Sequence, residues 1–297
     1  MRIWGIGAVA ALVLALTLPV GAAGIIEYGL EAPSPTLGRP IPYALYRPFP
    51  SPAQGERWPV VYLLHGLTGK DGDWFTWGNL GPILDQAIAD GRIQPLVVVA
   101  PGLADSWYVD SPDPGGFGKV DTAIATDLVA AIDAKLPTAA CRKGRAIGGN
   151  SMGGWGAVLQ AINHPDTYVA ALSFSGALHE PLTRGDPRSG WIPGLFRNVF
   201  GTPFSEARFN AANPFNRVRS LITMTKRPAF YLTVGDHDDF PDLIPAAVDF
   251  HNKLRVINAD TTLRIGPGRH FWDTWQQAII PALEWLAPRL DATCSSQ

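Results

Sequence analysis

Short apolar runs that alternate with amphipathic segments are the feature that most constrains the fold of this 297-residue chain. Five predominantly apolar runs lie at residues 60–64, 96–100, 145–148, 169–174 and 229–234. Runs of this length and composition are typical of strands buried on both faces of a parallel sheet. Five segments have apolar residues at three- and four-residue spacing and predict helices, at residues 82–90, 120–136, 152–163, 243–257 and 272–286. The alternation predicts a mainly parallel, doubly wound α/β sheet with helices on both faces.

Two segments do not follow this alternation of apolar runs and amphipathic segments. Residues 37–47 are bounded by prolines and alternate imperfectly, which predicts an early antiparallel strand. Residues 178–218 are rich in Pro, Gly, Arg and aromatic residues without a clean period, so we expect an irregular insertion there. Insertions of this length in compact enzymes often form lids or substrate-binding walls, and a surface excursion without a function is the alternative.

Residues 1–23 have the pattern of a signal peptide. Arg2 precedes an apolar run over residues 8–18, which ends at Pro19 and several small residues. The run is shorter than the roughly 20 residues that span a bilayer, so an uncleaved membrane anchor is the less favoured alternative. We therefore expect an exported protein, periplasmic or secreted, with one domain over residues 24–297 and no stable membrane anchor after cleavage.

The charged residues and the cysteines limit the partners of this chain. The formal net charge is −2, and without a run of Lys or Arg no dense basic face for nucleic acid is expected. The spacing of Cys and His suggests no metal site, and we expect no cofactor. Cys141 and Cys294 can pair in an oxidising compartment, and two unpaired thiols are the alternative, since the sequence does not supply their separation. The oligomeric state is left open.

The strongest local motif is Gly149-Asn150-Ser151-Met152-Gly153-Gly154, between the third apolar run and the helix predicted over residues 152–163. A serine on a sharp strand-to-helix turn has strained backbone angles, and flanking glycines leave room for that turn. The motif therefore predicts the nucleophile elbow of an α/β hydrolase at Ser151. A phosphate-binding loop is the alternative, which the absence of a Lys after the glycines disfavours.

A serine hydroxyl needs a base that accepts its proton and an acid that orients the base. In this fold the acid follows a later strand and the base lies near the final helix. Three acids, Asp236, Asp238 and Asp239, follow the run that ends at residue 234, and His270 precedes the last predicted helix. We predict that His270 is the base; an exposed histidine in a turn is the alternative.

Backbone N–H groups near the serine are expected to form an oxyanion hole. The run at residues 60–64 leads into a loop where Leu67 is expected to supply one donor, and Met152, next to the serine, the other. A plain turn is the alternative for the first loop. Trp77 and four further tryptophans gather in or beside the predicted surrounding loops. We expect substrate contacts from those four, Trp74, Trp107, Trp155 and Trp272, with core packing as the alternative.

Several stretches together resemble the esterase D-like branch of α/β hydrolases, which includes feruloyl and acetylxylan esterases of carbohydrate esterase family one. They are Leu37-Gly38-Arg39, Leu64-His65-Gly66, Ser106-Trp107-Tyr108-Val109-Asp110, the Ser151 elbow, Ser173-Phe174-Ser175-Gly176, and His270 followed by Trp272 and Trp275. The resemblance covers nearly all of the chain after the leader. It places the triad acid at Asp238, the fourth residue of a Gly-x-x-Asp turn that starts at Gly235, with Asp236 as the competing choice. Asn150 departs from the apolar residue often found before the serine.

The resemblance implies an exported serine esterase acting on short-chain or aryl esters, with acetyl or feruloyl groups linked to carbohydrate as the substrate class. Related members of the branch leave three alternatives. A mycolyltransferase-type acyltransferase would use the same acyl-enzyme with a sugar hydroxyl in place of water. An S-formylglutathione hydrolase-like thioesterase fits an exported chain poorly, since its substrate is cytosolic. A non-catalytic carbohydrate-binding module would keep the scaffold without using the triad.

Overall fold

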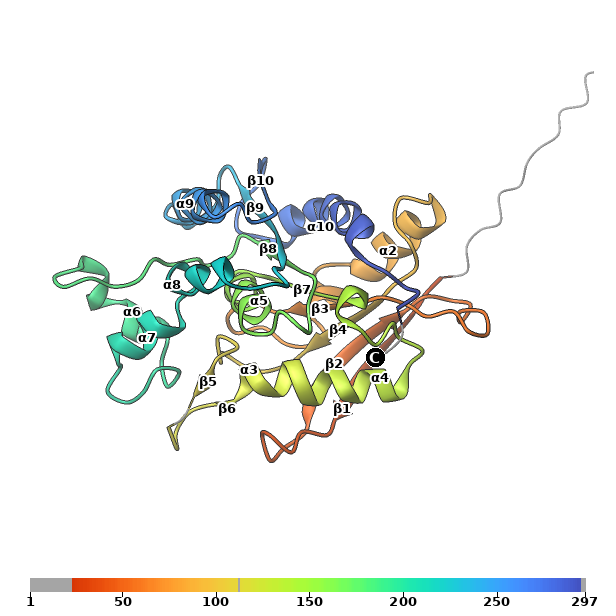
Figure 1. Ribbon diagram of the computed structural model, residues 1–297, viewed down its shortest axis with the longest axis horizontal. Coiled ribbons are helices and arrows are strands. Elements are labelled where there is room, and N and C mark those ends of the chain that lie inside the picture. The colour runs from red at the N-terminus through yellow and green to blue at the C-terminus, as the bar shows by residue number, and fades with distance from the viewer. Residues whose placement is uncertain (1–22, 112, 295–297) are drawn as a thin grey trace, which may run out of the picture.

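The computed structural model describes residues 23–111 and 113–294. Its centre is an eight-stranded sheet in the order β1-β2-β4-β3-β7-β8-β9-β10 (Figure 1). The strands are β1 (Ile25–Ala32), β2 (Ile41–Arg47), β3 (Val60–Leu64), β4 (Val97–Pro101), β7 (Arg145–Asn150), β8 (Ala170–Phe174), β9 (Ala229–Gly235) and β10 (Thr261–Gly266). β2 is antiparallel to β1 and β4, and the strands from β4 to β10 in this order are parallel. The predicted mainly parallel sheet is confirmed.

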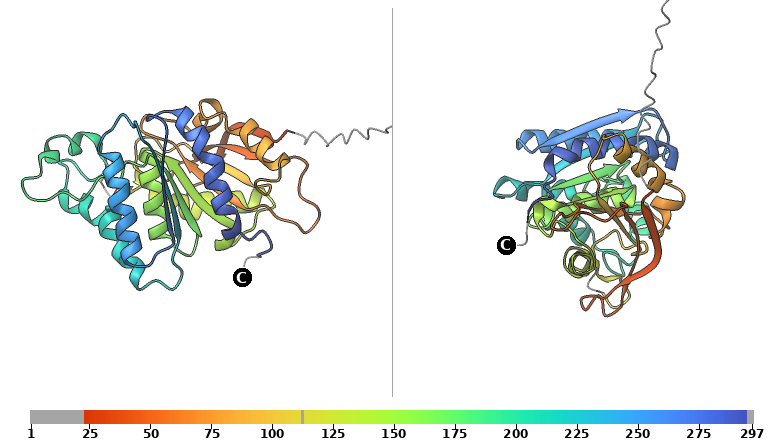
Figure 2. Two further views of the ribbon diagram at one scale, coloured as in Figure 1. Left: turned by 90° about the horizontal axis from the view of Figure 1, so that it is seen from above. Right: turned by 90° about the vertical axis from the view of Figure 1, so that its right-hand side faces the viewer.

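Helices cover both faces of the sheet (Figures 1 and 2). One face packs against α2 (Leu80–Ala89) and α10 (Trp272–Leu286), and the other against α4 (Val129–Lys135), α5 (Met152–Asn163) and α9 (Leu243–Val256). Shorter helical segments are α1 (Asp73–Thr76), α3 (Val120–Ala123), α6 (Ile192–Leu195), α7 (Glu206–Ala212) and α8 (Pro214–Arg217). A small separate sheet pairs β5 (Asp110–Ser111) with β6 (Gly118–Lys119).

The predicted elements differ from the structure at the sheet edges and in one helix. The sequence does not predict β1 or β10, because each is an outer strand with mostly half-exposed or exposed side chains and lacks a continuous apolar run. The helix predicted over residues 120–136 contains a π-helical turn, Ile124–Leu128, between α3 and α4. The early strand covers Ile41–Arg47 and not the whole of residues 37–47.

The strand order places two loops side by side at the carboxyl edge of the sheet. β3 pairs with β4 on one side and with β7 on the other, so the chain direction across the sheet reverses there. Leu64 and Gly149 are register partners, and therefore the loops after β3 and β7 leave the sheet at the same level. Ligands of open α/β sheets bind at such a switch point, beyond the carboxyl ends of the strands.

The insertion at residues 178–218 is irregular, as expected. It contains α6, α7, α8 and a 3₁₀ turn at Pro187–Gly190, and it extends to the left of the sheet in Figure 1. Its aromatic residues pack on one another and on the main core. The ring of Phe196 lies 5.0 Å from that of Phe209, 5.5 Å from that of Phe200 and 3.9 Å from that of Trp107. The insertion is therefore held by packing rather than by long helices.

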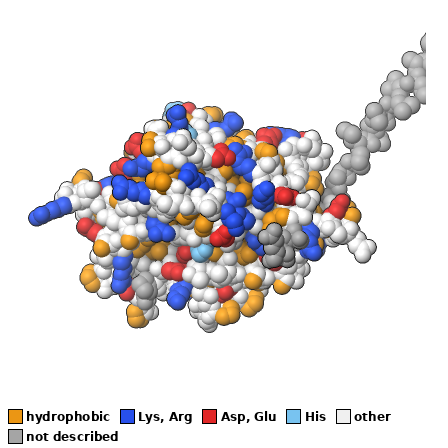
Figure 3. Space-filling model, viewed as in Figure 1, with side chains coloured by type: hydrophobic (Ala, Val, Ile, Leu, Met, Phe, Trp, Pro, Cys, Tyr) orange, Lys and Arg blue, Asp and Glu red, His pale blue; other side chains and the backbone are white. Residues whose placement is uncertain are grey.

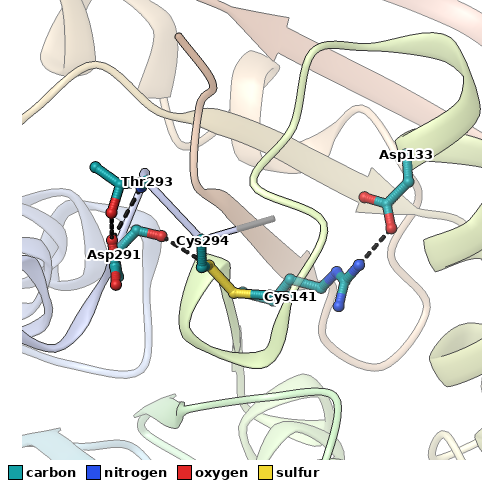
Figure 4. The surroundings of a disulfide bond; sticks show 6 residues. Asp133, Cys141, Asp291, Thr293 and Cys294 are labelled. Atoms are coloured by element: carbon teal, nitrogen blue, oxygen red, sulfur yellow. Dashed lines mark hydrogen bonds and ion pairs between the residues drawn. A yellow bond between two sulfur atoms is a disulfide. The ribbon is translucent and has the colours of Figure 1, made fainter. Parts of the chain in front are cut away.

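The two cysteines are paired. Cys141 and Cys294 form a disulfide with a Cα–Cα separation of 6.1 Å, which connects residues 153 positions apart (Figure 4). Cys141 precedes Arg145, the first residue of β7, whereas Ser151 follows the other end of that strand. The bond thus ties the C-terminal tail to the end of β7 that lies opposite the elbow.

Residues 1–22, which carry nearly all of the predicted signal peptide, lie outside the described residues. Within the described ranges, no helix combines the length and apolarity that a bilayer crossing requires. The face of the molecule seen in Figure 3 has Lys and Arg side chains interspersed with Asp and Glu.

Candidate active site

Ser151 lies on a sharp turn between β7 and α5. Its backbone angles, φ 54° and ψ −117°, are outside the regions that non-glycine residues ordinarily adopt. The turn depends on its glycines, because a Cβ at Gly149 would lie 2.5 Å from the Gly153 backbone and a Cβ at Gly153 would overlap the Leu64 carbonyl. Strand, turn and helix therefore have the order of a nucleophile elbow.

His270 lies in the loop between β10 and α10 and contacts Asp238, which follows β9. Its Nδ1 lies 3.0 Å from each carboxylate oxygen of Asp238. The Asp238 side chain is fully buried and that of His270 is one-tenth exposed. An Nδ1–H donor to a buried carboxylate leaves Nε2 as the basic nitrogen of the ring.

The neighbouring acids have other partners. Asp236 accepts hydrogen bonds from His237 and from the Gly268 N–H, and the bond from His237 holds the pKa of Asp236 below its ordinary value. Asp239 pairs with the Arg269 guanidinium, which lowers the pKa of Asp239 in the same way. Among the three candidate acids, only Asp238 contacts the imidazole of His270.

Ser151 and His270 line one cavity of about 900 Å³, together with both predicted oxyanion donors, Leu67 and Met152. Met152 is the first residue of α5, and N–H groups in the first turn of a helix have no carbonyl partner within that helix. Leu67 lies in the loop after β3. The structure thus places the candidate nucleophile, base and donors around one space.

The four tryptophans expected to contact substrate divide into two pairs. Trp107 and Trp272 line the cavity, whereas Trp74 and Trp155 are buried and do not. Trp74 packs edge-on against Trp272 at 5.3 Å and donates its Nε1–H to the Leu64 carbonyl, and Trp155 packs against Trp107 at 5.6 Å. The expectation of direct substrate contact is therefore corrected for Trp74 and Trp155, whose positions support the cavity wall from behind.

Sequence reasoning missed several wall residues. Trp77, one of the tryptophans expected in the surrounding loops, lines the cavity. Trp275, quoted from the sequence only as part of a motif, follows Trp272 by three positions, so helical spacing could have indicated its place on the wall. Trp191 lies in the insertion, whose sequence has no periodicity that would indicate which way this side chain points. Large exposed apolar side chains gather at this wall, and they are those of Leu67, Trp77, Trp191, Phe240 and Phe271.

A second His–Asp pair lies on the wall. His179, at the start of the insertion, has its Nδ1 3.4 Å from a carboxylate oxygen of Asp242, and the His179 hydrogen bond lowers the pKa of that carboxyl. Both residues line the cavity, so the pair places polar groups on a wall that is otherwise largely apolar. In the described part of the chain, no three or more His, Cys, Asp or Glu side chains are grouped to hold a metal ion.

Comparisons with known proteins agree with this geometry. The model of the Esterase family matches residues 34–286. An acetyl esterase of Caldicellulosiruptor saccharolyticus is 24% identical over 250 residues, which cover 80% of this chain and 87% of the relative. An endo-1,4-beta-xylanase/feruloyl esterase of Xylanibacter ruminicola is 33% identical over 135 residues, which are 45% of this chain but only 19% of that much longer protein.

Among solved structures, a ferulic acid esterase superposes with a TM-score of 0.70 at 22% identity, covering 90% of this chain and 98% of the other. This likeness shows the α/β-hydrolase fold, and the family match extends from before β2 to the end of α10. The chain belongs to the Esterase family and is a carboxylic ester hydrolase with the α/β-hydrolase fold.

Proposed function

We propose that this protein hydrolyses short-chain or aryl carboxylic esters, with carbohydrate-linked acetyl or feruloyl esters as the substrate class, through Ser151, His270 and Asp238. The observation that carries the proposal is the buried Asp238 carboxylate on Nδ1 of His270, in the cavity that Ser151 also lines. A neutral imidazole oriented in this way is the base that a serine nucleophile requires.

In the proposed reaction, Ser151 Oγ attacks the ester carbonyl carbon while its proton passes to Nε2 of His270. The N–H groups of Leu67 and Met152 stabilise the oxyanion of the tetrahedral intermediate. The imidazolium then gives its proton to the departing alkoxide as the carbon–oxygen bond breaks. Water deprotonated by His270 attacks the acyl-enzyme, and the acid leaves as the proton returns to Ser151. Asp238 stabilises the imidazolium in both halves.

The shape of the insertion supports the preference for short or aryl acyl groups. Its longest helix, α7, has only seven residues, so the insertion offers no long apolar helix for an extended acyl chain. The aromatic rings of Trp107, Trp191 and Trp272 on the wall suit a flat aryl or sugar ring. The related acetyl and feruloyl esterases act on acyl groups of this kind, as their names state.

A fluorophosphonate probe and an ester screen test the proposal. The wild type should be labelled and Ser151→Ala should not, because the probe forms a covalent bond with an activated serine. p-Nitrophenyl acetate or methyl ferulate should be cleaved faster than p-nitrophenyl palmitate. An unlabelled wild type would favour a binding module, and faster cleavage of palmitate than of every other ester would reject the substrate class.

The proposed site of action is outside the cytoplasm. The leader pattern of residues 1–23 and the Cys141–Cys294 disulfide support it, because disulfides persist mainly in oxidising compartments. Fractionation of cells that express the full chain should recover a shortened protein in the periplasm or the medium. A full-length protein retained in the cytoplasm would reject export.

A further inference from the structure

We propose that Asp105 is a positioning residue of the oxyanion hole, holding the loop that carries Leu67 from the neighbouring loop after β4. The proposal rests on the proposed function, because Leu67 is a donor there. Its structural basis is a 2.6 Å hydrogen bond from the Thr68 N–H to the Asp105 carboxylate.

The loop after β4 forms hydrogen bonds with the loop after β3 on both sides of Leu67. Before Leu67, His65 Nε2 accepts a hydrogen bond from the Leu103 N–H at 3.2 Å, and the His65 carbonyl accepts one from the Tyr108 hydroxyl at 2.8 Å. After Leu67 comes the bond from Thr68 to Asp105. Residues 103–108 thus fix residues 65 and 68, and the Leu67 backbone lies between the two fixed points.

The direction of the Leu67 N–H follows from the carbonyl of the same peptide. The Gly66 carbonyl oxygen lies 2.8 Å from His65 Nδ1 and accepts the Gly69 N–H at 3.1 Å. His65 Nε2 already accepts from Leu103, so Nδ1 carries the proton and donates to Gly66. The N–H of a planar trans peptide points opposite to its carbonyl. With the Gly66 carbonyl held by two donors, the Leu67 N–H is aimed away from them.

The hydrogen bond to Asp105 stabilises the loop at Thr68, which has an unfavourable backbone angle. Thr68 has a φ of 62°, in the left-handed region that a β-branched residue rarely adopts. A carboxylate that accepts the Thr68 N–H stabilises this conformation through a charge-assisted hydrogen bond. The supporting loop is strained as well, since Ala104, Trp107 and Tyr108 have φ values of 49°, 53° and 58°. Such strain persists where the surrounding contacts over-determine the backbone, and it clusters at functional sites.

The test compares Asp105→Ala with Asp105→Asn on p-nitrophenyl acetate. Removing an oxyanion donor costs about 100-fold or more in kcat, so a donor that is only misaligned in Asp105→Ala should cost roughly tenfold, with KM within about twofold. Asp105→Asn should stay near the wild type, because its amide oxygen can accept the same bond. An arylboronic acid, which forms a tetrahedral adduct on the serine, should bind Asp105→Ala more weakly by the factor lost in kcat/KM.

Two further variants separate positioning from general damage. Thr68→Gly adopts a positive φ without strain, so adding it to Asp105→Ala should recover most of the lost kcat. Asp113→Ala removes an acid that pairs with the Arg208 side chain at 2.8 Å, and it should keep the wild-type kcat. It is the matched control for loss of a carboxylate, because Asp113 and Asp105 are both half-buried.

Three results would overturn the proposal. They are wild-type kcat and boronate affinity in Asp105→Ala, an equal loss in Asp105→Asn, and no recovery on adding Thr68→Gly. If the wild type neither reacts with fluorophosphonate nor cleaves any ester, the proposed function itself fails. Labelling and turnover in the wild type, with no effect of Asp105→Ala, would reject only the positioning role.

Discussion

The imidazole Nδ1 of His270 lies 3.0 Å from both carboxylate oxygens of Asp238, while Asp236, two residues earlier, contacts His237 instead. The relationship makes Asp238 the residue that orients the base. It also lets two substitutions of the same kind be compared within one short loop.

Asp238→Asn is expected to lower kcat by about 10⁴-fold, because an amide can donate to Nδ1 and so favour the wrong tautomer of His270. Asp236→Asn is the matched control and should keep most of the activity, since its partners are His237 and the Gly268 N–H. Steady-state kinetics on p-nitrophenyl acetate measures both. Equal or reversed losses would assign the role to Asp236, and near-normal activity in both would implicate Asp239.

The tryptophans on and behind the cavity wall should respond differently to truncation. Trp191→Ala removes an exposed ring from the wall, so KM for methyl ferulate should rise more than KM for p-nitrophenyl acetate, with little change in stability. Trp74→Ala opens a hole in the core and should lower the free energy of unfolding by about 3–5 kcal/mol. Urea unfolding and ester kinetics on both variants check this contrast, which equal stability losses would contradict.

His65 should make stability depend on pH. Burial lowers the pKa of His65 below the ordinary value of 6.5, against opposing contributions from the Gly66 carbonyl and nearby aspartates. Below about pH 6.5, His65 therefore binds a proton more readily in the unfolded chain than in the folded protein. The contribution of neutral His65 to the free energy of unfolding is complete above this pH and is lost as the pH falls.

Urea unfolding between pH 8 and pH 5 measures the effect. The wild type should lose more free energy of unfolding than His65→Gln, which does not titrate. His251→Gln should also flatten the pH slope, because burial lowers the pKa of His251 as well, and it serves as the comparison at a half-buried site. A pH slope that His65→Gln leaves unchanged would show that other groups cause the acid sensitivity.

The disulfide should contribute to stability without taking part in catalysis. Replacing Cys141 and Cys294 together by Ser frees a tail linked across 153 residues, and should lower the free energy of unfolding by about 2–4 kcal/mol. The bond lies at the end of β7 opposite Ser151, so kcat at 25 °C should stay within about twofold. Denaturation and kinetics, with dithiothreitol-treated wild type alongside, check both expectations. A large fall in kcat of the folded variant would contradict the separation.

The sequence by itself determined the elements whose side chains face the core. The strand at residues 60–64 and the helices at residues 152–163 and 272–286 have the predicted bounds. Burial of one or both faces of a helix or strand requires apolar residues at regular positions, and this pattern is visible within a short stretch of sequence. The elbow at Ser151 could be predicted for a similar reason, because its strained turn requires glycines two positions before and two positions after the serine.

The tertiary structure alone decided which distant groups meet. β1 and β10 became strands through pairing at the sheet edges, where half-exposed side chains leave little apolar pattern. Asp238, and not Asp236, came to face His270 through the turn after β9, and the pairing of the cysteines depended on where the segment after α10 places Cys294. Whether a tryptophan lines the cavity or packs behind it depends on the direction of its side chain relative to other elements. Such contacts join residues far apart in the chain, so no local period encodes them.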